Sequence, residues 1–106
     1  MEYRIVFDCP NRKEIVDRLL EAASKAGAGS FGNYSRCAMV TTGYGTWKSE
    51  KGAKPAIGKI GRVSKVKSVR IEMSCPRGKV GVVCKAIRRA HPYEEPVIYS
   101  FRAEYA

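Results

Sequence analysis

The chain has 106 residues, 44% of them hydrophobic, and a formal net charge of +10 at pH 7. We expect a chain of this length to form one domain, residues 1–106, around a single core. No run of about 18 apolar residues is long enough to cross a membrane, and the N-terminus lacks the basic and apolar segments of a signal peptide, so we expect a cytoplasmic protein without membrane contact.

The first part of the chain predicts a strand, a helix and a second strand. Apolar and polar residues alternate over residues 3–9, which is typical of a strand. Asn11 has the character of a helix N-cap, with a glutamate three residues later as its capping-box partner. An amphipathic helix covers residues 15–26 and ends at Gly27. A second strand is expected over about residues 34–42.

The second part predicts the same three elements after a long connection. Residues 43–62 are rich in glycine and lysine and exceed the usual length of a hairpin loop, so they are either a functional loop or contain short strands. A third strand is expected over about residues 66–75. A second amphipathic helix follows, with its apolar face within residues 80–90, and Pro92 ends it. The last strand covers residues 97–103.

This order of elements predicts an α+β ferredoxin-like sandwich. The alternation assigns core positions to Ile5, Phe7, Cys9, Val69, Ile71, Met73 and Cys75. In the last strand it places Val97, Tyr99, Phe101 and Ala103 on the helix-covered face. The open face is expected to carry Arg4, Val6, Asp8, Arg70, Glu72, Ile98 and Arg102. An open sheet face usually finds a second layer, and an oligomer provides one.

The four cysteines form no metal-binding or redox motif. Cys9, Cys37, Cys75 and Cys84 lie far apart in the sequence, and each stands in an apolar pattern. A zinc site needs clustered thiolate and imidazole ligands. Cysteines scattered in this way are typical of small buried side chains in a reducing compartment. We predict no cofactor and no metal site.

Positive charge is concentrated in one part of the chain. Residues 48–89 contain thirteen Lys or Arg against two Glu, whereas the remaining residues contain seven basic and eight acidic side chains. Such an asymmetry indicates an anionic partner. The alternative is that the lysines only keep the protein soluble.

Five short motifs in order resemble one known domain type. The segment His91-Pro92-Tyr93-Glu94-Glu95-Pro96 stands between a helix and an apolar strand. Residues 32–35, 43–47, 55–58 and 69–72 match the same pattern at suitable spacing. Together they resemble the YqfO/CutA-like domain, which is an insert in the dinuclear-metal family described as GTP cyclohydrolase I type 2 homologs.

The resemblance implies a CutA/PII-like ferredoxin fold with a long extra hairpin between strands 2 and 3, commonly assembled as a trimer. In the larger family the metal ligands lie in flanking domains, and the chain looks like a free-standing copy of the insert. A dinuclear site needs several His, Asp and Glu ligands, and this chain has one histidine. Whether the chain is an enzyme stays open, and the absence of this ligand cluster favours a non-catalytic protein.

Two segments are candidates for a ligand site. In residues 43–47, two glycines can expose backbone amides to an anion and the single tryptophan can stack on a ring. The alternative is a bulged hairpin with the indole packed on a neighbour. In residues 91–95, imidazole, phenol and carboxylates converge on a binding site or specify a stiff junction. We expect a site between the loop of residues 43–59 and the turn of residues 91–95, formed by Gly43, Gly45, Trp47, Lys59, His91, Tyr93, Glu94 and Glu95.

The sequence therefore predicts a small, non-catalytic, oligomeric module for binding a ligand or for regulation, with a trimer favoured and an anionic small molecule as the ligand. The alternative function is binding of nucleic acid or another polyanion without sequence specificity, through Lys85, Arg88 and Arg89 on the second helix. Glu94 and Glu95 are expected to form an ion pair with the basic stretch of a neighbouring subunit.

Overall fold

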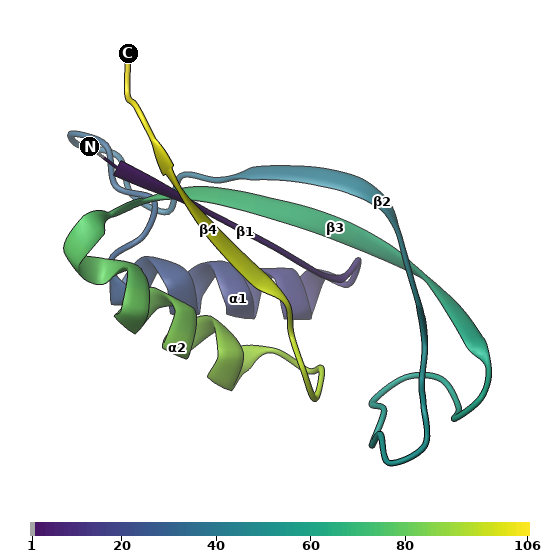
Figure 1. Ribbon diagram of the computed structural model, residues 1–106. Helices are drawn as coiled ribbons and strands as arrows, with labels where there is room; N and C mark the ends of the chain where they lie inside the picture. The colour runs from purple at the N-terminus through teal and green to yellow at the C-terminus, as the bar shows by residue number, and fades with distance from the viewer. Residues whose placement is uncertain (1) are drawn as a thin grey trace.

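The fold is described by a computed structural model of residues 2–106. Its elements, in chain order, are β1 (Glu2–Pro10), α1 (Lys13–Ala26), β2 (Met39–Lys48), β3 (Val63–Pro76), the 3-10 turn η1 (Arg77–Lys79), α2 (Val80–Ala90) and β4 (Ile98–Ala103). The strands form one antiparallel sheet in the order β2-β3-β1-β4. Both helices lie on the same face of this sheet (Figure 1). The predicted ferredoxin-like fold is therefore confirmed.

The core lies between the sheet and the helices. Alternate residues are buried there over residues 5–9 of β1 and residues 69–75 of β3, and the helices contribute one apolar stripe each. Burying one Val, Leu, Ile, Phe or Met side chain stabilises a fold by roughly 1.5–3 kcal/mol. The buried apolar residues include Ile5, Phe7, Cys9, Leu19, Val69, Ile71, Met73, Cys75, Val83 and Ile87. The alternation in β1 and β3 therefore identified the core correctly.

Cys9 and Cys75 are buried in this core, and all four cysteines are free thiols. Burial raises the pKa of the Cys9 thiol to about 11, with a smaller contribution from the carboxylate of Asp8. A thiol that stays protonated is a poor nucleophile and a poor metal ligand.

No helix within residues 2–106 has both the length and the apolar character needed to span a membrane.

The orientation predicted for β4 is wrong. Ile98 stands opposite Phe7 and packs against the core, whereas Tyr99 stands opposite Val6 on the open face. Tyr99 is 66% exposed and Phe101 is 49% exposed. Both sets of alternate positions in this strand contain large apolar residues, so the sequence pattern did not distinguish the faces. Pairing with β1 decides the orientation, because a shift of one residue moves every side chain to the other face.

The start of α1 also differs from the prediction. The N-cap position is Arg12, and no side chain caps it. The N–H of Asn11 donates to the carbonyl oxygen of Lys67 at 2.9 Å and so continues the pairing with β3. Asn11 therefore still pairs with β3 at the end of β1, and the chain turns into the helix at Arg12.

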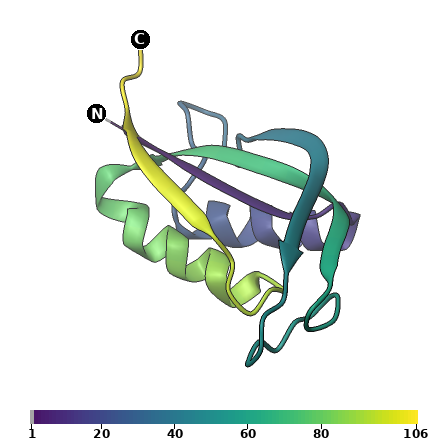
Figure 2. The ribbon, with the colours of Figure 1, turned by 45° about the vertical axis from the view of Figure 1, so that its right-hand side comes forward.

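Strand β2 begins and ends later than predicted. It contains residues 43–47, at the start of the connection that was expected to be a functional loop or to contain short strands. Gly43 and Gly45 stand opposite Ser68 and Val66 in the regular ladder, and neither has a positive φ. Successive amides of an extended strand point to opposite edges, so they do not converge on an anion as in a nest. The alternative prediction, a hairpin with the Trp47 indole packed on a neighbouring side chain, agrees with the structure except that the ladder has no bulge here. The ends of β2 and β3 form a two-stranded ribbon that projects beyond the helices (Figures 1 and 2).

Candidate functional site

The ribbon ends in residues 49–62, here called the tip loop, which lies against residues 91–97, here called the turn segment. An open cleft of about 720 Å³ lies between them. Its walls are formed by residues 48–53 and 55–57, by Trp47 and Asp8, and by residues 93–95 with Val97. Of the residues predicted for the site, Trp47, Tyr93, Glu94 and Glu95 line this cleft.

His91 fixes the start of the turn segment. Its ring is 8% exposed, and the N–H of Tyr93 donates to Nδ1 at 3.1 Å. Since Nδ1 accepts, the proton is on Nε2, which donates to the carbonyl oxygen of Asp8 at 2.7 Å. Burial lowers the pKa of His91, and the hydrogen bond to Asp8 opposes this effect only in part. Both ring nitrogens are thus used within the chain, so His91 is a structural anchor of the junction.

Aromatic rings connect His91 to the cleft. The ring centroids of His91 and Tyr93 are 4.9 Å apart, and those of Tyr93 and Trp47 are 5.4 Å apart, with tilted planes. The Tyr93 hydroxyl is buried and has no hydrogen-bond partner within residues 2–106. Burial raises the pKa of Tyr93, so the hydroxyl stays protonated. A buried hydroxyl without a partner costs about 1–3 kcal/mol, and a bound ligand atom would remove that cost.

Glu94 ties the tip loop to the turn segment. Its Oε1 accepts a hydrogen bond from the backbone N–H of Lys54 at 3.0 Å. Glu95 lines the cleft without such a contact. Glu94 is therefore already engaged within its own chain, which weakens the expectation of an ion pair with a neighbouring subunit.

The cleft carries charges of both signs. Its acidic residues are Asp8, Glu50, Glu94 and Glu95, and its basic residues are Lys48 and Lys51. The Nζ atom of Lys48 lies 3.9 Å from Oε1 of Glu50. Sequence analysis missed Asp8 as a site residue, although the alternation in β1 placed it on the open face. What it lacked was the pairing of β1 with β3, which brings Asp8 beside the ribbon.

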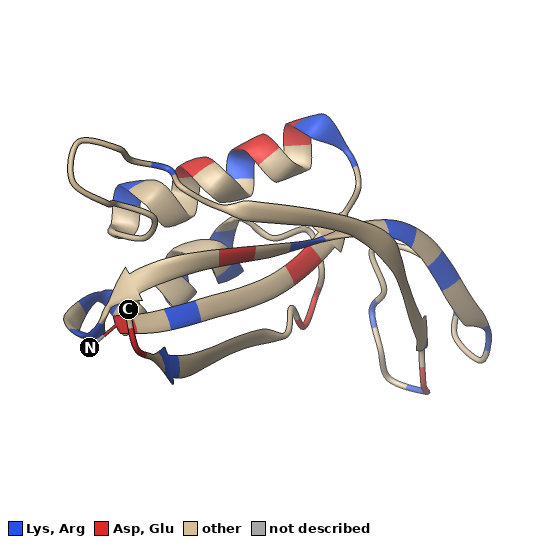
Figure 3. Cartoon of the chain, turned by 90° about the horizontal axis from the view of Figure 1, so that it is seen from above, with Lys and Arg blue, Asp and Glu red and all other residues tan. Residues whose placement is uncertain are grey.

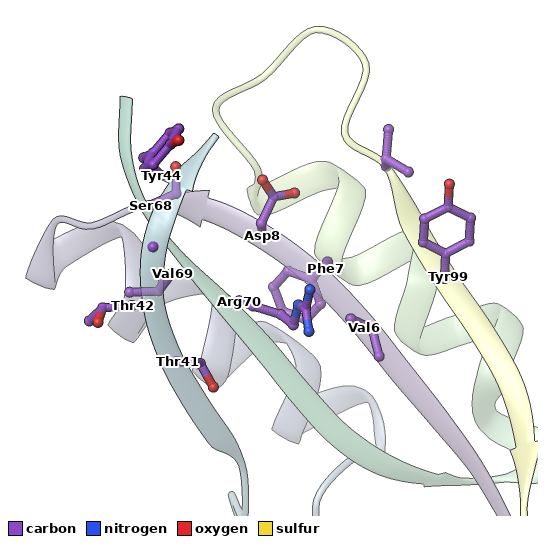
Figure 4. Close-up of a pocket in the computed structure, with 12 residues that line it drawn as sticks. Val6, Phe7, Asp8, Thr41, Thr42, Tyr44, Ser68, Val69, Arg70 and Tyr99 are labelled. Atoms are coloured by element: carbon purple, nitrogen blue, oxygen red, sulfur yellow. The ribbon is translucent and has the colours of Figure 1, made fainter. Parts of the chain in front are cut away.

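Several residues predicted for the site lie outside the cleft. Lys59 is on the tip loop but does not line the cavity. A side chain at Gly45 would come within 3.3 Å of Ser68 Oγ, so this glycine permits close strand packing. Gly43 lines a second cavity of about 450 Å³ on the open face of the sheet. Figure 4 shows Asp8, Arg70 and Tyr99, from three different strands, around this second cavity.

The predicted polyanion contacts are on α2 and do not line the cleft. Lys85, Arg88 and Arg89 are all exposed. The guanidinium of Arg88 donates to the carbonyl oxygen of Pro96 at 3.4 Å, so the Arg88 side chain contacts the turn segment. No cluster of three or more His, Cys, Asp or Glu side chains within residues 2–106 is placed to hold a metal ion.

Comparison with known proteins agrees with the resemblance found in the sequence. No family model matches the chain. A GTP cyclohydrolase 1 type 2 homolog from Halalkalibacterium halodurans is 40% identical over 94 residues, which cover 89% of this chain and 25% of that protein. The homolog from Bacillus subtilis is 41% identical over 83 residues, which cover 78% of this chain and 22% of that protein. The chain spans about a quarter of the length of these curated relatives.

Solved structures show the same relationship. A Bacillus cereus protein related to NIF3 has a TM-score of 0.81 and 31% identity, and the match covers 98% of this chain and 26% of that one. The divalent cation tolerance protein CutA1 from Thermus thermophilus has a TM-score of 0.72 at 13% identity, and the match covers 100% and 87% of the two chains.

The chain thus has a ferredoxin-like fold of the kind seen in CutA1. More particularly, the chain is a relative of one segment of the GTP cyclohydrolase 1 type 2 homolog proteins.

Proposed function

We propose that the chain is a small, non-catalytic, oligomeric module that binds a ligand in the cleft between the tip loop and the turn segment. The observation that carries this proposal is Tyr93, whose buried hydroxyl has no partner within residues 2–106 and whose ring centroid lies 5.4 Å from that of Trp47 at the cleft. A cavity with an apolar wall and a few polar groups is the usual form of a small-molecule site.

The ligand class that fits best is a small anion with a planar ring. The ring packs on Trp47 and accepts or donates a hydrogen bond at Tyr93. The anionic group lies toward Lys51, which forms no ion pair within residues 2–106, and toward the further lysines of the tip loop. Among the acidic residues of the cleft, Glu94 is engaged by the Lys54 amide and Glu50 lies near Lys48.

Trp47 is the only tryptophan of the chain, so tryptophan emission, excited at a wavelength that tyrosine does not absorb, reports on this cleft alone. We expect AMP, which carries both ring and anion, to change the emission in a saturable way. Adenosine carries the ring alone and ribose 5-phosphate the anion alone, and each is expected to bind more weakly. Tyr93→Phe keeps the ring and should weaken AMP binding about fivefold, equivalent to one hydrogen bond of about 1 kcal/mol.

Tyr105→Phe is the matched control, because Tyr105 is exposed and lies outside the cleft. An unchanged emission with AMP at millimolar concentration would overturn the proposal. The name of the structurally similar CutA1 protein, divalent cation tolerance protein, suggests the competing outcome. A saturable response to Mg²⁺ or Cu²⁺ alone, abolished by Asp8→Asn with Glu95→Gln, would show that the ligand of the cleft is a cation and not an anion.

Assembly is the second part of the proposal. Val97, Tyr99 and Phe101 are exposed beside the edge strand β4 and leave an apolar patch in solvent. Patches of this kind mark contacts between proteins, and an unpaired edge strand invites pairing. We propose a homo-oligomer, with a trimer favoured, in which this patch is covered by a second copy. Light scattering at high concentration should give a multiple of 11.8 kDa, and a monomer mass would contradict it.

A further inference from the structure

The two faces of the projecting ribbon differ in chemistry. The ribbon is formed by residues 44–48 of β2 and residues 63–67 of β3. One face, here called the basic ribbon face, carries the cross-strand pairs Tyr44–Lys67, Thr46–Lys65 and Lys48–Val63. The opposite face carries Gly45–Val66 and Trp47–Ser64, which have no charge, and it contributes Trp47 to the cleft. Lys65 and Lys67 are therefore on one face of the ribbon and outside the proposed ligand site, whereas Lys48, at the end of the ribbon, also lines the cleft.

The basic ribbon face continues the side of the sheet that the helices cover. Lys67 and Lys65 follow the same alternation as the buried residues Ile71 and Val69. In this direction the helices end before the ribbon does, so these positions face solvent (Figure 1). Figure 3 shows bands of basic residues along the projecting end of β3. Along this face of β3, the residues change from apolar to lysine where the core ends. The ribbon beyond that point is a narrow two-stranded arm with cations on one side.

These cations are not neutralised within the chain. Residues 48–67 contain seven Lys or Arg and one acidic residue, Glu50. Among residues 2–106, neither Lys65 nor Lys67 lies within ion-pair distance of a carboxylate, and Lys48 reaches only Glu50, at 3.9 Å. The Lys65 ammonium lies 4.3 Å from the centroid of the Tyr44 ring. Cations concentrated on one narrow surface create a local positive potential that attracts an anionic polymer.

We propose that the basic ribbon face binds duplex nucleic acid by inserting the ribbon into the major groove. A groove of about 12 Å admits a two-stranded β-ribbon, and lysines on its exposed side reach the phosphates. Recognition is independent of sequence, because this face carries no Arg, Asn or Gln to read base edges. A duplex fits better than a single strand, since Lys65 already covers one face of the Tyr44 ring that unpaired bases would stack on.

The test is fluorescence anisotropy of a labelled mixed-sequence duplex, measured over a series of salt concentrations. The logarithm of the association constant should fall linearly with the logarithm of salt. The double variant Lys65→Gln/Lys67→Gln should bind more weakly and reduce the slope by about two, since each phosphate contact contributes about 0.9. Unchanged Trp47 emission and circular dichroism would show that this variant is folded.

The matched control is Lys85→Gln/Arg89→Gln, which removes the same charge from α2. We expect it to keep the slope of the parent protein. An equal loss in both double variants, or a loss only in the α2 variant, would overturn the ribbon site. Tighter binding of the corresponding single strand, or of phosphatidylserine vesicles, would overturn the choice of duplex nucleic acid as the partner.

Discussion

At the scale of single residues, His91 links stability to pH. Burial lowers its pKa below the ordinary value of 6.5, so the folded chain binds the proton less readily than the unfolded chain. Protonation would also remove the acceptor that Nδ1 offers to the Tyr93 N–H. The contribution of neutral His91 is therefore complete above pH 6.5 and is lost as the pH falls below it.

His91 is the only histidine, so this part of the pH dependence can be assigned to one side chain. The free energy of unfolding in urea should fall between pH 7 and pH 5 in the parent protein. His91→Gln should be less stable at pH 7 by about 1–3 kcal/mol, because buried hydrogen bonds are lost. The variant should also show a flatter profile over this interval, and an equally steep profile would count against the assignment.

Gly29 is a second position at which one residue decides a local structure. Its φ is +77°, and a Cβ atom there would lie 2.7 Å from the carbonyl oxygen of Cys37 and 2.8 Å from Met73 Cε. Gly29→Ala should therefore destabilise the fold by about 2–4 kcal/mol, from backbone strain and overpacking together. Gly32→Ala is the control, because its φ is also positive, at +52°, but its Cβ would meet nothing within 4 Å. That change should cost only about 1–2 kcal/mol.

At the scale of elements, the tip loop is held to the turn segment by the hydrogen bond from the Lys54 amide to Glu94. Glu94→Ala removes the acceptor, and we expect the tip loop to move away and Trp47 to become more exposed to water. The emission of Trp47 should shift to longer wavelength. Glu95→Ala is the matched control, since Glu95 lines the same cleft without that bond. Identical spectra for the two variants would show that Glu94 does not hold the loop.

The elements also show what a sequence can reveal. Strands β1 and β3 were located by alternation, because each has one buried and one exposed face. Strand β2 was placed too early, because its side chains are almost all exposed and its glycines are typical of a loop. Its true limits depend on pairing with β3, which no local pattern contains. The orientation of β4 failed for the related reason that it carries apolar side chains on both faces.

The candidate site shows the same limit. The sequence identified both segments that line the cleft, since prolines and aromatic residues mark the turn segment and the single tryptophan marks the ribbon. It did not show that Tyr93 contacts both Trp47 and His91, which requires the three-dimensional path of the turn segment. It also did not show that Lys65 and Lys67 lie on the opposite face of the ribbon from Trp47. That arrangement follows from the extension of β2 into residues 43–48.

At the scale of the whole molecule, the ribbon and the sheet assign different partners to different surfaces. One face of the ribbon borders the cleft with Trp47, and the other carries Lys65 and Lys67. The open face of the sheet, away from both helices, presents the apolar patch on β4. A second copy on this patch leaves the basic ribbon face free, because it is directed to the helix side of the sheet. The proposed assembly and the proposed nucleic-acid contact are therefore compatible in one molecule.

The assembly itself can be tested at Tyr99, which stands on the open face opposite Val6 and is 66% exposed. Tyr99→Glu places a charge in the proposed contact without disturbing the core, and desolvating a carboxylate there is costly. Light scattering should then give the monomer mass of 11.8 kDa. Val82→Glu adds the same charge at a 56% exposed apolar residue of α2 and should leave the oligomer intact. If Val82→Glu alone dissociates the oligomer, the contact between copies lies on the helices, and the open face is left for another partner.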